Sequence, residues 1–147
     1  MPKKMRYRFI EHTADVEFVA YGETIEQLFV NALTAMFDTV ADIKKLKNLK
    51  EQKRKLELFE KAPELEDLLW FSLQDALSLI DSNGLQGFSV DSLKIRKNGP
   101  DYVLAAWLEG RKKNQKLAKL DVKGVSRFDM HIELGRKGYT ATVVLDV

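Results

Sequence analysis

The chain has 147 residues, of which 45% are hydrophobic and 31% charged, and it has no cysteine. These values predict one folded domain spanning residues 1–147, and they exclude a disordered chain, a disulfide scaffold and any site built on cysteine. The formal net charge of +2 is too small to indicate nucleic-acid binding by itself. No apolar run suits a signal peptide or a membrane span, so we expect a soluble, cytoplasmic protein that does not bind a membrane.

The first elements in chain order are two extended segments followed by a helix. Partial alternation of apolar side chains predicts strands over 6–12 and 16–21. Thr24 suits the N-cap of a helix, and Gln27 stands at the capping-box position three residues later. Apolar residues then recur at helical spacing as far as Val40, so we expect an amphipathic helix here.

The rest of the chain predicts a second helix and a set of strands. Pro63 suits the first turn of this helix, and Asn83-Gly84 suits its end. Alternating residues predict strands over 53–60, 88–96, 102–109, 117–134 and 138–146, the segment 117–134 being either one strand or one interrupted by a bulge or break. The expected fold is therefore α+β, with two amphipathic helices packed on a largely antiparallel β-sheet in a single compact domain.

Two clusters of basic residues interrupt this pattern. The first is Lys44, Lys45, Lys47, Lys50, Lys53, Arg54 and Lys55, and the second is Arg111, Lys112, Lys113, Lys116 and Lys119. Lysines commonly protect solvated loops and edge strands from association. The alternative is a surface for RNA or for an acidic partner.

Two polar features at strand ends are candidate sites. Glu11-His12-Thr13-Ala14-Asp15 follows the first predicted strand, where it either builds a site or caps the turn. Asp146 interrupts an apolar terminal strand one residue before Val147. A buried carboxylate there needs a cation or hydrogen-bond donors, unless the end of the chain is solvated.

A third candidate lies in the predicted strand 117–134. Asp129, His131 and Glu133 would share one face of that strand, which is either a metal site or a solvated outer face. Phe128 would lie on the opposite face with Met130 and Ile132. We therefore expect Phe128 to be buried in the core.

Several of these motifs together resemble the archease family. The most specific is the opening run Tyr7-Arg8-Phe9-Ile10-Glu11-His12-Thr13-Ala14-Asp15-Val16. Glu66-Asp67-Leu68-Leu69, Val122-Lys123-Gly124-Val125-Ser126 and Leu145-Asp146-Val147 are similar to later family motifs, in the same order. The family usually has Thr-Tyr-His where this chain has Ser126-Arg127-Phe128, so the surface that meets the partner is expected to differ there.

The resemblance implies a function and a metal site. Archeases activate the RtcB-type RNA ligase of tRNA splicing and RNA repair by promoting its guanylylation and multiple turnover, and they are not enzymes themselves. A divalent cation, Ca²⁺ or else Mg²⁺ or Mn²⁺, is implied at Asp15, Asp146 and Val147, the last through a main-chain or terminal oxygen. Oxygen ligands alone suit hard cations of this kind.

Two other functions stay open at this stage. The resemblance also implies a chaperone-like role toward a tRNA methyltransferase, with or without contact to tRNA. The residues themselves allow a small metal-dependent hydrolase that uses Asp15, Asp146 and His12, because carboxylates around a divalent ion can activate water.

Overall fold

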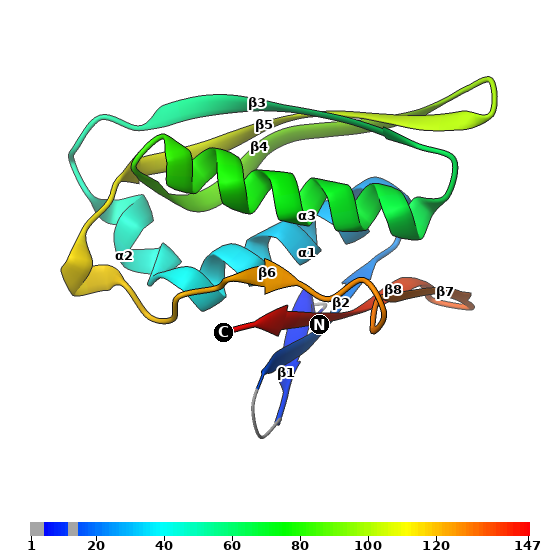
Figure 1. Cartoon of the computed structure of the whole chain (residues 1–147), viewed down its shortest axis with the longest axis horizontal. Coiled ribbons are helices and arrows are strands. Elements are labelled where there is room, and N and C mark those ends of the chain that lie inside the picture. The colour runs from blue at the N-terminus through cyan, green and yellow to red at the C-terminus, as the bar shows by residue number, and fades with distance from the viewer. Residues whose placement is uncertain (1–4, 12–14) are drawn as a thin grey trace.

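The computed structural model describes residues 5–11 and 15–147, and Figure 1 shows it as a layered α+β domain. The order of elements in these residues is β1 (Tyr7–Ile10), β2 (Val16–Gly22), α1 (Ile25–Val40), α2 (Ile43–Asn48), β3 (Arg54–Ala62), α3 (Leu65–Ser82), β4 (Leu85–Asn98), β5 (Asp101–Lys112), a 3₁₀ turn (Gln115–Leu117), β6 (Gly124–Val125), β7 (His131–Gly135) and β8 (Gly138–Asp146).

The strands of the described residues form two antiparallel sheets with helices between them (Figure 1). In the larger sheet β8 pairs with β2 along one edge and with β6 and β7 along the other, and β1 pairs with the outer edge of β2. The smaller sheet has the order β3-β5-β4. The predicted α+β class is confirmed, but the strands divide into two sheets because β3 and the β4–β5 hairpin lie on the far side of α3 from β8.

The core fills the space between the two sheets. Its largest fully buried side chains come from both sheets and from the helices: Phe18, Phe29, Leu28, Leu33, Met36, Leu46, Leu68, Leu69, Leu73, Leu104, Leu108 and Leu145. Helix α1 is buried on more than one face, since it packs against both β2 and β4. Burial of this apolar surface is the main stabilising contribution to such a fold.

Thr24 caps α1 and Asn83-Gly84 ends α3 as predicted, whereas Pro63 lies just before the Glu64 N-cap of α3 and not in its first turn. The Thr24 hydroxyl accepts a hydrogen bond from the Gln27 amide at 3.1 Å, and Gln27 Oε1 accepts one from the Glu23 amide at 2.9 Å. Helix α3 starts two residues after Pro63 and ends before Gly84, whose φ of +69° favours glycine. In the described part of the chain, none of the helices is long and apolar enough to cross a membrane.

A short helix, α2, was not predicted from the sequence. Its apolar residues, Ile43 and Leu46, are three apart and both buried, while the lysines between and after them are exposed. The Asp42 side chain caps it by accepting a hydrogen bond from the Lys45 amide at 3.2 Å. Two apolar residues are too few to reveal a helix by their periodicity.

The predicted strand 117–134 is broken, and only its parts in β6 and β7 are extended in the sheet. Residues 118–123 instead cross the end of α1, where the Lys119 amide donates to the Val40 carbonyl at 2.8 Å. A turn then separates β6 from β7, held by the bond from the Ser126 hydroxyl to Asp129 at 2.8 Å. This turn points Phe128 into solvent, where it is 101% exposed, so the expectation that Phe128 is buried is wrong.

Candidate metal centre

The pairing of β2 with β8 brings the two predicted carboxylate ligands to the same end of the larger sheet. Val16 is the register partner of Leu145 in this antiparallel pair. Asp15 immediately precedes Val16 and Asp146 immediately follows Leu145, so both lie at the end of the sheet where this pairing stops. Residues from opposite ends of the chain therefore lie at the same end of the sheet.

Asp146 is held by β6 and by the residue that precedes β6. Its carbonyl oxygen accepts a hydrogen bond from the Lys123 amide at 2.7 Å, and Gly124 is its register partner. A Cβ at position 124 would lie 3.8 Å from Asp146 Oδ2, so this carboxylate lies against the β6 backbone. Asp146 and Val147 are exposed, and Asp15 is partly buried.

This donor set fits a hard divalent cation in its chemistry. Carboxylate and main-chain oxygens are the ligands that Ca²⁺ and Mg²⁺ prefer, so two carboxylates at one sheet end suit such an ion. The described residues contain no group of three or more His, Cys, Asp or Glu side chains that could hold a metal. The predicted set has only two such side chains, because Val147 would contribute an oxygen of the main chain or terminus. His12 and Thr13 lie outside the described residues.

The second predicted metal site does not form as a three-residue face. Asp129 lies in the turn before β7 and accepts the Ser126 hydroxyl bond. His131 is exposed, with Nε2 at 2.9 Å from Glu133 Oε1 and Nδ1 at 3.5 Å from Glu66 Oε2. Asp129, His131 and Glu133 are all exposed to solvent. The alternative interpretation, a solvated outer surface, therefore describes this segment.

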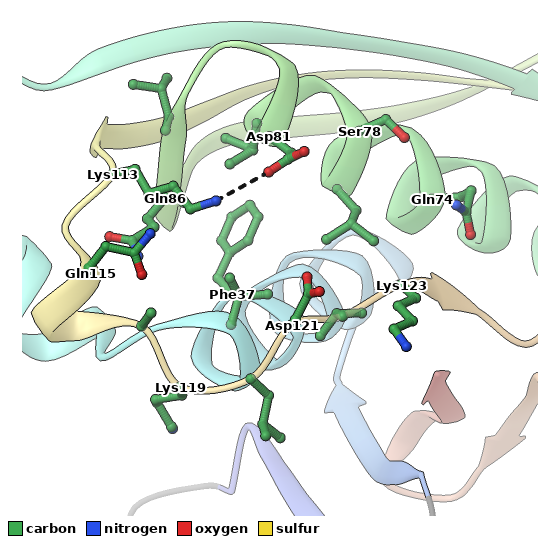
Figure 2. Close-up of a pocket in the computed structure, with 18 residues that line it drawn as sticks. Phe37, Gln74, Ser78, Asp81, Gln86, Lys113, Gln115, Lys119, Asp121 and Lys123 are labelled. Atoms are coloured by element: carbon green, nitrogen blue, oxygen red, sulfur yellow. Dashed lines mark ion pairs between the residues drawn. The ribbon is translucent and has the colours of Figure 1, made fainter. Parts of the chain in front are cut away.

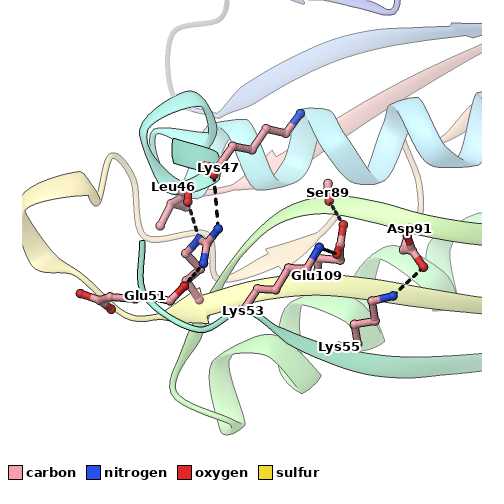
Figure 3. Close-up of polar contacts among 9 residues, drawn as sticks. Leu46, Lys47, Glu51, Lys53, Lys55, Ser89, Asp91 and Glu109 are labelled. Atoms are coloured by element: carbon pink, nitrogen blue, oxygen red, sulfur yellow. Dashed lines mark hydrogen bonds and ion pairs between the residues drawn. The ribbon is translucent and has the colours of Figure 1, made fainter. Parts of the chain in front are cut away.

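The two basic clusters contain several residues with internal partners. Arg111 is 8% exposed and donates to the carbonyls of Leu46 at 2.6 Å, Lys47 at 3.3 Å and Glu51 (Figure 3). Other members form ion pairs with acids of neighbouring elements: Lys53 with Glu109, Lys55 with Asp91, Lys113 with Asp81 and Lys119 with Asp38. The clusters are therefore not continuous basic surfaces.

A cavity of about 570 Å³ lies between α1, α3 and residues 113–123 (Figure 2). Phe37 from α1 lines it, and Asp81 and Lys113, also lining residues, form an ion pair with an Nζ–Oδ1 distance of 3.6 Å. None of the predicted metal ligands lines it. The candidate metal centre therefore lies outside this cavity, at one end of the larger sheet.

Sequence reasoning missed one surface feature, a pair of exposed aromatic side chains on the smaller sheet. Phe59 is 62% exposed and Trp107 42% exposed. The sequence did contain a signal for the exposure of Phe59. In a strand Phe59 shares a face with Glu57 and Lys61, which are both charged.

The fold and the paired carboxylates define a small α+β protein with a candidate metal centre at one sheet end. The profile of the Archease protein family (MTH1598/TM1083) matches residues 7–147. The protein archease of Methanosarcina barkeri is 34% identical over 146 residues, covering 97% of this chain and 96% of the relative. The Methanosarcina mazei protein archease is 31% identical over 144 residues, with 97% and 96% coverage. The chain belongs to the archease family.

Solved structures agree with this assignment. The solution structure of Methanobacterium thermoautotrophicum protein 1598 has a TM-score of 0.77 at 26% identity, covering 97% of this chain and 99% of that one. The crystal structure of a Thermotoga maritima archease, described as a possible chaperone, has a TM-score of 0.60 at 20% identity, covering 99% and 100%. At 20% identity, the Thermotoga maritima structure supports the fold of this chain alone.

Proposed function

We propose that this chain is an accessory protein that activates an RtcB-type RNA ligase, promoting its guanylylation and multiple turnover in tRNA splicing and RNA repair. It acts in the cytoplasm and does not itself catalyse a reaction on RNA. A divalent cation, preferentially Ca²⁺, is held by Asp15, Asp146 and an oxygen of Val147.

The observation that carries the proposal is that Asp15 and Asp146 lie at the same end of the β2–β8 pair. The two residues belong to the two motifs at opposite ends of the chain that resemble archeases most, and pairing in the sheet sets them at one edge. Both carboxylates are at least partly exposed, so a cation bound there could also meet a protein partner. When bound, the cation would neutralise the two acids.

The test is a guanylylation assay with the RtcB-type ligase of the same organism. The full chain, with Ca²⁺ or Mn²⁺ present, should accelerate ligase guanylylation at substoichiometric amounts, and alone it should neither join nor cleave RNA. Asp15→Asn and Asp146→Asn should each abolish the acceleration without unfolding the protein. Glu51→Gln, which neutralises an exposed acid in another part of the molecule, should have no effect.

Two results would reject the proposal. One is the absence of any effect of the full chain on the cognate ligase, and the other is turnover of RNA by the chain alone, which would favour the hydrolase. A chaperone-like function is the second candidate, because the Thermotoga maritima relative is described as a possible chaperone. In that case the chain should reduce aggregation of a tRNA methyltransferase during heating, and the ligase assay should show no response.

A further inference from the structure

The outward-facing side of the smaller sheet presents aromatic and basic side chains to solvent. Helix α3 covers the other side of this sheet, whose outward side is open in Figure 1. We call this surface the outer-sheet face and define it by Phe59, Lys61, Lys94, Arg96, Ala105 and Trp107. The register confirms that these residues share one side, since Phe59 and Lys94 both pair with Ala105, and Lys61 and Arg96 both pair with Val103.

The two aromatic side chains lie on adjacent strands and are diagonal neighbours on the same face of the sheet. Trp107 of β5 is opposite Glu57, two residues before Phe59 on β3. Diagonal neighbours of this kind are roughly 7–8 Å apart, within reach of one another's rings. The small side chain of Ala105, next to both, leaves the ring surfaces accessible. Their exposures of 62% and 42% are high for aromatic residues, which are usually buried.

Positive charge without an internal partner is concentrated beside these rings. None of the ion pairs within the described residues includes Lys61, Lys94 or Arg96, and all three side chains are exposed. At the other end of the same sheet the charges are neutralised, because Lys53 pairs with Glu109 at 2.8 Å and Lys55 with Asp91 at 3.0 Å (Figure 3). The excess charge therefore lies where the aromatics are.

We propose that the outer-sheet face binds single-stranded RNA. Bases stack on Phe59 and Trp107, and phosphates run along β4, where Lys94 and Arg96 lie, away from the acid Glu57 beside Trp107. Aromatic platforms flanked by cations are the common way in which sheets hold unpaired strands. A duplex is disfavoured because its bases stack on each other. The choice of RNA over DNA rests on the proposed function, whereas the stacking argument does not.

The first experiment measures binding of a short fluorescein-labelled oligouridine to the full chain by anisotropy, without any ligase. Phe59→Ala should weaken binding about tenfold, because stacking on one aromatic side chain contributes that much. Lys94→Gln and Arg96→Gln should each reduce the slope of log affinity against log salt by about 0.7. Phe128→Ala and Lys116→Gln, exposed residues elsewhere, are matched controls that should change nothing.

A second readout tests stacking directly. Tryptophan fluorescence of the full chain should be quenched by unlabelled oligouridine, and Trp107→Phe should lose most of this quenching while it still binds. Unchanged quenching in that variant would overturn the role of Trp107.

Three further results would overturn the proposal: no saturable binding at low ionic strength, equal affinity for an RNA hairpin stem, or equal competition by polyglutamate, which would indicate an acidic protein partner. Equal affinity for oligothymidine would overturn the assignment to RNA. Because no ligase is present, failure of ligase activation would leave these results unaffected.

Discussion

At the scale of single residues, Glu60 is a carboxyl group whose protonation depends on the fold. It lies on the inner face of β3 with Leu58 and Ala62, toward α3. Burial, followed by a hydrogen bond and charge repulsion with Asp75 of α3, raises the pKa of Glu60 to about 8. The folded protein therefore keeps a proton on Glu60 over a pH range in which the unfolded chain has released it.

This pKa predicts how stability depends on pH. Between about 4.5 and about 8 the folded chain binds more protons than the unfolded chain, so the free energy of unfolding should fall as pH rises through this window. Glu60→Gln keeps a donor for the Asp75 carboxylate but does not titrate. Melting curves should show that the original chain loses stability from pH 4.5 to pH 8, whereas the variant does not lose it through this group. The stability of the variant relative to the original chain should therefore rise over this range. A constant difference over this range would contradict the assigned pKa.

Phe128 is the second residue with a specific expectation. Its side chain is fully exposed at the tip of the turn between β6 and β7, next to Arg127, whose Nη2 lies 2.7 Å from Asp67 Oδ1. Phe128→Ala should change the free energy of unfolding by no more than about 0.5 kcal/mol, as for other surface substitutions. By contrast, Phe29→Ala in the core should cost about 3–5 kcal/mol. Urea denaturation of the two variants side by side tests this contrast.

At the scale of elements, α2 depends on a side chain from another part of the fold. The buried Arg111 guanidinium, from the end of β5, donates to three carbonyls in and just after α2 and lies over the Phe88 ring at 5.2 Å. A six-residue helix has too few internal hydrogen bonds to be stable alone. We infer that Arg111 is what holds this lysine-rich segment on the core.

Arg111→Met should therefore loosen α2 and cost about 2–3 kcal/mol, because the carbonyls of Leu46 and Lys47 lose a charged donor. Arg111→Lys should rescue little, since an ammonium cannot reproduce the guanidinium fork. Lys47→Gln is the matched control, because it leaves the Lys47 carbonyl in place. Amide hydrogen exchange across residues 43–48 should be faster in the two Arg111 variants and unchanged in Lys47→Gln. Unchanged exchange in the Arg111 variants would show that the packing of Ile43 and Leu46 is sufficient to hold α2 on the core.

At the scale of the whole molecule, the candidate metal centre combines residues from near the start and at the end of the chain. Its residues lie at the same end of the sheet because β8, the last strand, pairs with β2, which follows the first motif. A ligand that binds only the folded form stabilises it by mass action, by about 2.7 kcal/mol at a hundredfold excess over Kd. Metal binding should thus raise the melting temperature of the full chain.

A chain shortened to end at Leu145 should lose the rise in melting temperature that Ca²⁺ or Mg²⁺ produces, and Asp146→Asn should reduce it. The shortened chain also loses the bond between the Lys123 amide and the Asp146 carbonyl, so its melting temperature without metal should be lower. The comparison is therefore the metal-induced shift within each protein. Asp129→Asn, in the turn before β7, should retain the full shift. Equal shifts in the full and shortened chains would reject the site.

Local patterns in the sequence were sufficient for several features of the fold. The spacing of apolar residues and the Thr24 and Pro63-Gly84 signals placed both long helices, because these signals act within one or two turns of the chain. Motifs of consecutive residues likewise identified the archease family, whose profile covers residues 7–147. Asp15 and Asp146 could be nominated as a pair from those motifs, although nothing local to either residue indicates the other.

Other features depended on contacts between distant residues, which no local pattern records. Pairing of β2 with β8 sets Asp15 near Asp146, and the pairing of β5 with β3 and β4 assembles the outer-sheet face. Arg111 stands among exposed lysines in the sequence, yet the tertiary structure buries it beneath α2. The alternation of apolar residues predicted a strand that continues through Phe128. In the structure, contacts of residues 118–123 with α1 and the turn from Ser126 to Asp129 interrupt this strand. Burial is a property of the assembled layers, so the sequence by itself could not distinguish a buried arginine from a solvated one.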